Sequence, residues 1–314
     1  MSPSADISDS NSDPRDNPSK QSSSKTNGHS TRGQQDERTG ASSRALISRL
    51  LDDVSLDHTG APILACCFIS GICDSVAFNA TGTFASMQTG NTIFLALGAS
   101  HLPPNQPTLW LRALVSIVSF WAGCFLFAQF HRWTKRPQRK LVLATSFLIQ
   151  TLFIVLSAAL AQSRVLIPSF GKTNLSSHLN EHELSIREAE ENDARTLVPL
   201  ALLAFQFGGQ IVSSRVLGIN EVPTNVLTSL YCDLLSDPLL MAGWKGGKGN
   251  KKRDRRVVAI ILLIVGGVAG GWLQRSEAGM SAALWIAAGI KGAVTVGWLF
   301  WRGREPKLEP KNGV

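Results

Sequence analysis

Residues 61–100 decide the fold, and they read APILACCFISGICDSVAFNATGTFASMQTGNTIFLALGAS. This stretch contains a single charged side chain, that of Asp74. Soluble domains rarely bury so long a run without charges, whereas a bilayer requires about 20 apolar residues for each helix that crosses it. The stretch has twice that length, and the polar sequence NATGT at 79–83 interrupts it. We therefore expect one net membrane crossing plus a broken, re-entrant or interfacial piece.

Further apolar segments follow along the chain, and four of them have the length of one membrane-spanning helix: 109–130, 141–161, 257–273 and 280–301. A second long segment, 197–240, matches the first because the sequence RVLGINEVPTN interrupts it. The sequence therefore predicts an all-α integral membrane protein, with a polytopic membrane domain over 59–302. We expect about six transmembrane helices, arranged as two inverted three-helix repeats with broken first segments. Two crossings in each long segment would give the alternative of eight helices.

The positive excess beyond residue 58 lies in short clusters beside the apolar segments, which is typical of residues that orient a membrane protein. The loop at 131–140 carries five Lys or Arg and no acidic residue, and the loop at 244–256 carries seven against one Asp. We expect both loops in the cytoplasm. The loop at 162–196 has six acidic and four basic residues and contains an N-glycosylation sequon at Asn174, so we expect it on the opposite side. Both termini are then cytoplasmic, and the choice of membrane stays open.

The N-terminal residues 1–58 carry 16 charged side chains, and 12 of the first 45 residues are serines. Such a segment buries too little apolar surface to offset the chain entropy lost on folding, so we expect a disordered cytoplasmic tail. Residues 44–58 place apolar side chains at helical spacing and predict a short amphipathic helix at the membrane face. A helix that binds a partner is the alternative. Residues 303–314 are expected to form a basic cytoplasmic tail.

Polar residues gather at both interruptions, where Gly and Pro favour departure from helical geometry. Backbone groups freed inside a membrane need partners, which Thr, Asn and Gln side chains supply around a water-filled cavity. Broken helices at matching positions of inverted halves are typical of a transporter site, although hydrogen-bonded contact between helices is the alternative. The expected solute or ion pathway consists of Asp74, Gln88, Thr89, Gly90, Asn91 and Thr92 in the first half and Gln210, Thr224, Asn225 and Thr228 in the second.

Asp74 and Lys291 each lie deep within an apolar segment, where a charge costs at least ~2.5 kcal/mol to insert. Asp74 is interpreted either as a proton carrier, cation carrier or substrate contact, or as a structural anchor. Lys291 lies near the middle of the last segment, and its long stem also allows the ammonium group to reach an interface. A charge pair between Lys291 and Asp74 is a further hypothesis.

The segment at 257–273 contains overlapping GxxxG pairs, formed by Gly266, Gly267, Gly270 and Gly271. Glycines at this spacing allow two helix backbones to approach closely. The partner helix belongs either to the same chain or to a second copy in a homo-oligomer.

The sequence offers no set of residues that points to catalysis. His178, Glu181 and His182 match the order of one metalloprotease motif, but they stand in a charged loop with no apolar helix face behind them. The five cysteines lie in apolar surroundings without metal-ligand spacing. We expect no enzyme activity, no metal and no cofactor, and the lack of an aromatic-studded basic surface argues against nucleic acid as a partner.

The first long segment resembles a known family. It contains Gly71-x-x-Asp74 followed by Thr89-Gly90-Asn91, which is similar to the signature of the YoaK-type multi-pass membrane proteins, domain of unknown function 1275. The second half resembles that family at Gly209-Gln210 and Val222-Pro223-Thr224, and departs from it at Ser229, where the family usually has Gly. The resemblance covers about residues 60–300. It implies an integral membrane protein of about six helices without an established substrate.

The sequence as a whole favours a secondary transporter or permease of an unidentified small solute or ion, embedded in the lipid bilayer. A membrane scaffold or interaction protein that transports nothing is the alternative. An intramembrane enzyme ranks third.

Overall fold

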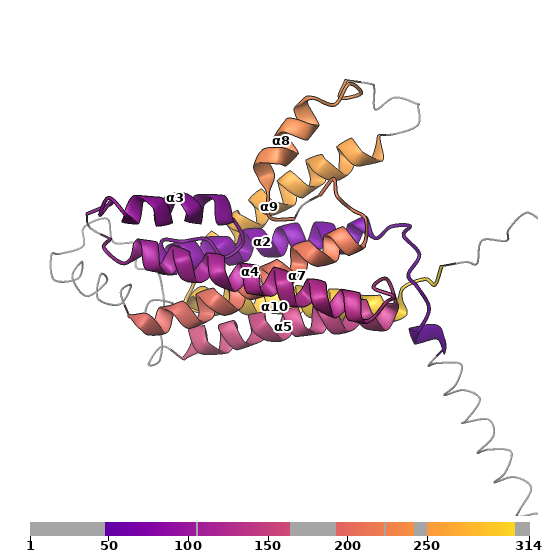
Figure 1. Cartoon of the computed structure of the whole chain (residues 1–314), viewed down its shortest axis with the longest axis horizontal. Coiled ribbons are helices and arrows are strands. Elements are labelled where there is room, and N and C mark those ends of the chain that lie inside the picture. Colours follow the sequence, from indigo (N-terminus) through magenta and orange to yellow (C-terminus); the bar gives the residue numbers. More distant parts are fainter. Residues whose placement is uncertain (1–47, 105, 164–192, 223, 242–249, 305–314) are drawn as a thin grey trace, which may run out of the picture. The chain divides into compact units, whose positions relative to one another are not determined.

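The computed structural model describes residues 48–104, 106–163, 193–222, 224–241 and 250–304 (Figure 1). The predicted disordered region at 1–45, the sequon at Asn174 and the motif at 178–182 lie outside the described residues, as do residues 305–314. The elements below belong to the compact unit Ile47–Val314.

Six helices in the described part of the chain are long and apolar enough to cross a membrane. They are α2 (Gly60–Thr81), α4 (Leu109–Trp133), α5 (Lys140–Gln162), α7 (Leu197–Val216), α9 (Lys251–Arg275) and α10 (Gly279–Phe300). The turn η2 (Ala194–Thr196) leads into α7, and two short helices follow the first long helix of each half: α3 (Gln88–Gly98) and α8 (Leu227–Leu235).

This architecture confirms the predicted all-α fold with about six spans. The eight-helix alternative is wrong because α3 has 11 residues and α8 has 9, whereas a crossing helix needs about 20.

Each broken segment turns at a glycine. Gly82 ends α2 with φ 69°, and Gly218, two residues beyond the end of α7, has φ 72°. Both values lie in the left-handed region that glycine adopts without steric cost. Both interruptions therefore begin at a glycine with positive φ, placed just after the first long helix of each half.

The two halves run in opposite directions. In Figure 1, α2 proceeds from right to left, whereas α7 proceeds from left to right. The most extensive helix pairs are α2 with α9, α4 with α7, and α5 with α10. The first helix of each half thus packs against the second helix of the other, and the third helices pack together. This is the pairing expected of inverted repeats.

Glycines bring the crossed pairs into close contact. A Cβ atom added to Gly71 on α2 would collide with the Leu263 carbonyl oxygen and lie 2.7 Å from the Gly267 nitrogen, both on α9. In the other pair, a Cβ on Gly208 of α7 would lie 2.6 Å from the Cys124 nitrogen of α4. Gly266 and Gly270 also face α2, whereas Gly271 has open space. The GxxxG glycines Gly266, Gly267 and Gly270 therefore serve packing within the chain.

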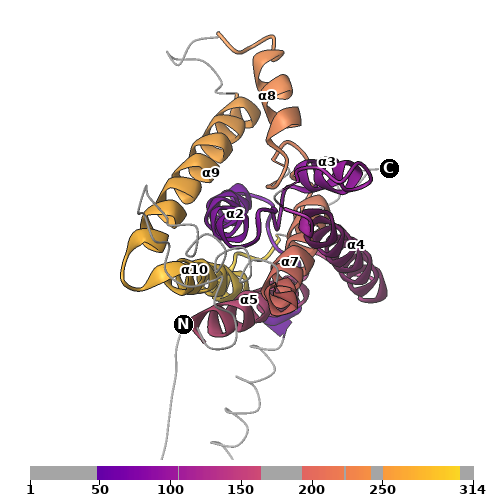
Figure 2. The same ribbon diagram turned by 90° about the vertical axis from the view of Figure 1, so that its left-hand side faces the viewer.

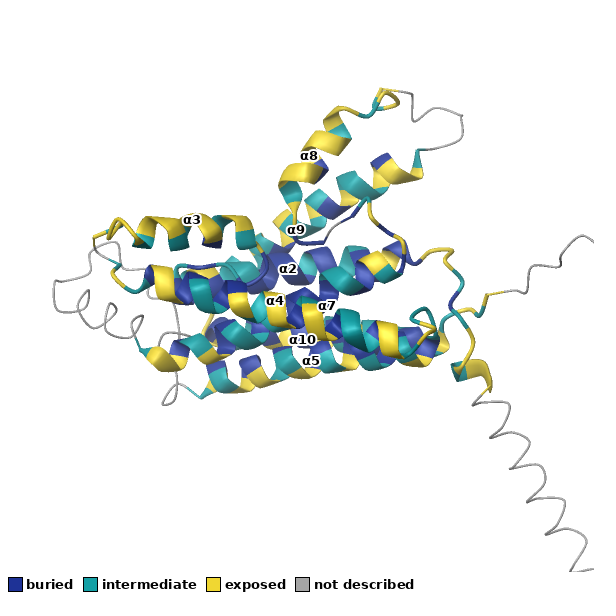
Figure 3. Ribbon diagram, in the orientation of Figure 1, coloured by how far each residue is buried: buried dark blue, intermediate teal, exposed yellow. Residues whose placement is uncertain are grey.

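The first helix of each half lies deepest in the bundle. Figure 2 shows α2 and α7 near the centre, with α9 and α4 towards the outside. The apolar stretch of α7 is 61% buried and that of α2 is 56% buried, against 22% for α9. Figure 3 shows the same contrast as a dark core and largely exposed outer faces. The polar residues of both breaks are thus attached to the most buried helices.

The residues before α2 form an extended strap at one end of the bundle. The Val54 amide donates to the Gln138 carbonyl (2.9 Å), and the Ser55 amide donates to the Arg302 carbonyl (2.8 Å). The strap ties the basic loop at 131–140 to the end of α10. Of the described residues in the amphipathic helix predicted over 44–58, only 48–50 are helical, because the backbone after them pairs with two other segments and Val54 is buried.

We expect Gly71→Ala to lower the free energy of unfolding by about 1–3 kcal/mol, because its methyl group collides with backbone atoms of α9. The matched control is Gly271→Ala, which meets no atom within 4 Å and adds helix propensity, so its stability should stay within about 1 kcal/mol of wild type. Thermal unfolding of the detergent-solubilised protein measures both. Equal effects of the two substitutions would contradict the packing described here.

Candidate functional site

Polar side chains on one face of α2 contact both broken segments. Cys66, Ser70 and Asp74 follow one another at intervals of four residues, so they lie on the same side of the helix. Asp74 contacts the first break, and Ser70 contacts the second. We call the residues at the first break the turn cluster (Asp74, Ser86, Gln88, Asn91, Ser116) and those at the second break the lysine cluster (Cys66, Ser70, Gln210, Thr224, Asn225, Lys291).

The Asp74 carboxylate holds the turn that follows α2. One oxygen accepts hydrogen bonds from the backbone amides of Ala85 (3.0 Å) and Ser86 (2.7 Å), and the other accepts from the Ser86 hydroxyl (2.5 Å). The chain leaves α2 after Thr81 and folds back to the level of Asp74, about 10 Å along the helix. Asp74 therefore anchors a re-entrant turn.

Asn91 fixes the same turn from α3. Its side-chain oxygen accepts from the Phe84 amide (3.0 Å), and its NH2 group donates to the Phe84 carbonyl (2.7 Å). The Ser116 hydroxyl of α4 also donates to the Phe84 carbonyl (2.8 Å), and the Gln88 NH2 group donates to Ser116 (3.2 Å). Because these side chains pair the backbone of the break, the turn can leave helical geometry without exposing unpaired groups.

The remaining predicted residues of the first half lie elsewhere. Thr89 and Thr92 are exposed on α3, and Thr92 donates only to the Gln88 carbonyl of its own helix (2.9 Å). A Cβ on Gly90 would lie 3.2 Å from the Phe84 ring, so Gly90 serves packing. The structure therefore joins Asp74, Gln88 and Asn91 in one cluster and leaves the two threonines outside it.

Lys291 is completely buried in the middle of α10. Its ammonium group donates to the Gln210 side-chain oxygen of α7 (2.5 Å) and lies 3.9 Å from the Cys66 sulfur of α2. The group also lies 5.3 Å from the centre of the Phe147 ring on α5. One buried cation thus contacts three other helices, and its neighbours in these contacts are all uncharged groups.

Gln210 links Lys291 to the second break. Its NH2 group donates to the Ser70 hydroxyl (2.9 Å) and to the Asn225 side-chain oxygen (3.1 Å). That same Asn225 oxygen also accepts from Ser70 (3.3 Å) and Thr224 (2.9 Å). The Asn225 NH2 group donates to the Phe207 carbonyl (3.4 Å), so the chain after α7 has folded back about 14 Å along the helix. The second break is therefore re-entrant like the first.

The lysine cluster contains residues that the sequence did not single out, and one expected residue lies outside it. Ser70 and Cys66 were not expected in the site, although their four-residue spacing from Asp74 was visible in the sequence. Thr228 was expected in the site, but it is exposed on α8. Ser116 of the turn cluster had no signal in the sequence, because a lone serine in an apolar helix is unremarkable.

The hypothesis of a charge pair between Asp74 and Lys291 is wrong for this structure. Among the described residues, ion pairs within 4.0 Å do not include these two side chains. The carboxylate of Asp74 is occupied by the amides and hydroxyl at residues 85–86, and Lys291 is occupied by Gln210. The anchoring interpretation of Asp74 agrees with these contacts.

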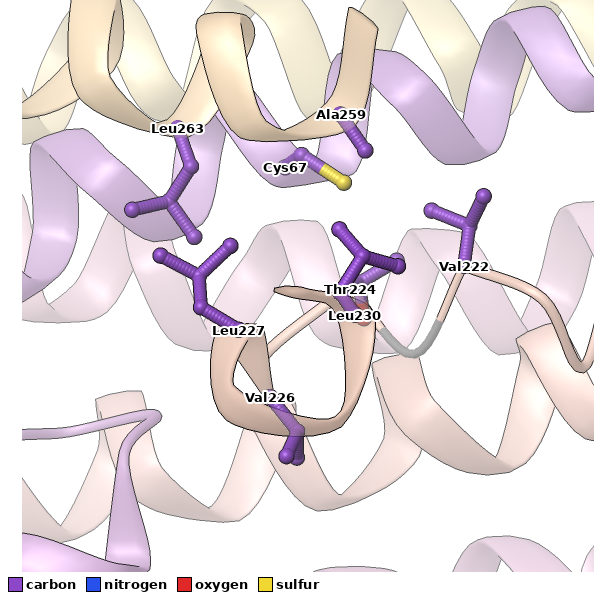
Figure 4. Close-up of a pocket in the computed structure, with 8 residues that line it drawn as sticks. All are labelled: Cys67, Val222, Thr224, Val226, Leu227, Leu230, Ala259 and Leu263. Carbon is purple, nitrogen blue, oxygen red and sulfur yellow. The ribbon is translucent and has the colours of Figure 1, made fainter. Parts of the chain in front are cut away.

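Pockets of very different size lie beside the two breaks. At the first break, a pocket of about 590 Å³ is lined by the ends of α2 and α3 and by the chain leading into α4, including Phe78, Leu97 and Gln106. At the second break, the pocket shown in Figure 4 measures about 10 Å³, room for about one water molecule. Figure 4 shows Thr224 and Leu227 facing Cys67 and Leu263 across it.

Charged residues hold α8 against the first turns of α9. Arg256 lies 3.4 Å from Asp237 and 3.7 Å from Asp233, and Arg255 pairs with Glu221 at 2.8 Å. The Leu239 backbone amide and the Asn250 side chain donate to Asp237 and hold the pKa of that carboxyl below its usual range. These contacts join the chain after the second break to the start of α9.

The six apolar helices and the buried polar clusters define a polytopic α-helical membrane protein with two re-entrant breaks. A family model described as "Protein of unknown function (DUF1275)" matches residues 63–297, and the chain belongs to that family. The match confirms the resemblance seen in the sequence. No curated protein and no solved structure matches the chain.

We expect Asp74→Ala to destabilise the protein by about 2–4 kcal/mol, because it leaves the buried amides of residues 85 and 86 without an acceptor. Asp74→Asn retains a side-chain oxygen for these amides and should cost clearly less. Hydrogen exchange of the Ala85 and Ser86 backbone amides measures their protection directly. Exchange should be faster in Asp74→Ala than in Asp74→Asn. Unchanged exchange in Asp74→Ala would show that the carboxylate does not hold the turn.

Proposed function

We propose that this protein is a secondary transporter or permease of a small solute, with the lysine cluster as the solute site. The observation that carries the proposal is the contact of Asn225, in the second break, with Ser70 and Gln210 inside the most buried helices. Secondary transporters commonly place their site near mid-membrane, where a discontinuous segment meets the inverted half. The lysine cluster has both features, since α2 and α10 come from different halves.

The two breaks differ in the space beside them, and of the lysine cluster only Thr224 lines either pocket. The pocket at the first break has a volume of about 590 Å³, whereas the pocket at the second break holds about 10 Å³. Alternating access requires one side to be open while the other is closed. The re-entrant turns are the moving parts in this proposal, because each is held by a few side-chain hydrogen bonds.

We propose in addition that both chain ends face the cytoplasm. The strap at residues 52–55, the basic loop at 131–140 and residues 302–304 are hydrogen-bonded to one another at one end of the bundle. Lys251–Arg256, the basic start of α9, belongs to the same side because successive spans alternate in direction. Clusters of Lys and Arg mark the cytoplasmic side of membrane proteins.

Flux into proteoliposomes tests the transport proposal. Wild-type protein, reconstituted and offered a panel of small charged and neutral solutes, should carry at least one of them. Thr224→Val removes a buried hydrogen bond to Asn225 and should lower that flux about fivefold, the equivalent of about 1 kcal/mol. Thr228→Val makes the same change on the exposed face of α8 and should leave the flux unchanged.

Correctly folded protein that carries no solute of the panel would contradict the transport proposal. That outcome would favour the alternative, a membrane scaffold. Equal loss of flux in both valine variants would contradict the placement of the solute site at the lysine cluster.

A further inference from the structure

The lysine cluster has a charge that the chain itself does not balance. Lys291 is completely buried, and its contacts are an amide oxygen, a thiol sulfur and an aromatic face. Among the residues that the structure describes, no carboxylate forms an ion pair with it within 4.0 Å. An ammonium group inside a membrane is costly without a negative partner. In its protonated form, Lys291 therefore has no negative partner among the described residues.

At the first break, the chain itself supplies a negative group. There the turn before α3 presents the amides of residues 85 and 86, and the Asp74 carboxylate accepts both. The chain supplies its own anion at that position. The second break has the same re-entrant geometry ahead of α8, but the corresponding position is filled by neutral Gln210 and Asn225, next to the cation Lys291.

Donors converge on one neutral oxygen in the lysine cluster. The Asn225 side-chain oxygen accepts from Gln210 (3.1 Å) and Thr224 (2.9 Å), and the Ser70 hydroxyl, whose proton also reaches the Cys66 carbonyl (3.0 Å), lies 3.3 Å from it. Three donors around one oxygen are the surroundings that a carboxylate usually receives. In addition, α8 begins at Leu227 without a side-chain cap, so the positive end of its dipole adds to the local potential. Each of these groups favours a negative ligand.

We propose that the lysine cluster is a binding site for a small monovalent anion, with Lys291 as its counter-charge. Ser70, Gln210 and Thr224 turn their donors from Asn225 to the bound anion. A neutral ligand would leave the ammonium unbalanced, and a cation would add a second positive charge, so both fit the site less well. The identification of this anion as the transported solute rests on the proposed function, whereas the binding site itself does not.

Anion titration of the purified full-length protein tests the site. Thermal unfolding is followed in neutral detergent with sodium chloride, nitrate, formate, acetate and lactate at constant ionic strength. At least one of these anions should raise the melting temperature by several degrees, because a ligand that binds only the folded state stabilises it. Lys291→Met should abolish that rise. Lys140→Met, a matched change at the start of α5, should retain it.

A second variant keeps the test decisive where Lys291→Met fails to fold. Gln210→Glu places a carboxylate at the atom that now contacts the Lys291 ammonium. This variant supplies the missing negative charge from within the chain, so its melting temperature should no longer depend on the anion. An equal anion response in wild type, Lys291→Met and Gln210→Glu, or no response to any of the five anions, would overturn the proposal.

Flux measurements separate this proposal from the transport proposal. Anion binding that depends on Lys291, with no flux of that anion, would retain the site and contradict transport. Flux of a neutral or cationic solute that is lost in Thr224→Val, with no anion response, would retain transport and overturn the anion site.

Discussion

Two segments of this chain leave helical geometry within the depth of the six long helices, and there each freed amide or carbonyl needs a partner from the protein, because lipid offers none. Asp74 and Asn91 meet this requirement at the first break, and Gln210 and Asn225 tie down the second. The most buried helices, α2 and α7, carry these breaks, and glycines bring each of them against a helix of the opposite half. The position of the polar clusters follows from that packing.

The two breaks have the same backbone turn but differ in the charge of the side chains beside them. Both turn at a glycine with positive φ and return along the helix just left. The first return is held by a carboxylate, whereas the second lies beside a lysine with neutral partners. The chain thus supplies a carboxylate at the first break and neutral groups beside the lysine at the second. This asymmetry is the basis for assigning binding to the second break.

The sequence predicted the fold well, because a run of 20 uncharged apolar residues has few structures open to it. Charge and glycine placement also indicated that the segments at 61–100 and 197–240 each cross once and then break. The composition of the two polar clusters was predicted only in part. Gln210, Thr224 and Asn225 stand out as polar residues in apolar surroundings and lie together in the lysine cluster. Thr89, Thr92 and Thr228 were expected beside them but are exposed outside both clusters. The side of a short helix on which a threonine lies depends on tertiary packing, and the partner of Lys291 depends on which helices cross at its depth.

The central claim is that the second break is part of a site that opens in turn to each side of the membrane. The most direct measurement is labelling of Thr224→Cys by a membrane-impermeant thiol reagent, in a chain whose five native cysteines are replaced by alanine. The reagent is applied to oriented vesicles from one side and then from the other. We predict labelling from both sides at Thr224→Cys, and from the cytoplasmic side alone at Thr228→Cys. Labelling of Thr224→Cys from one side only, or from neither, would contradict the account.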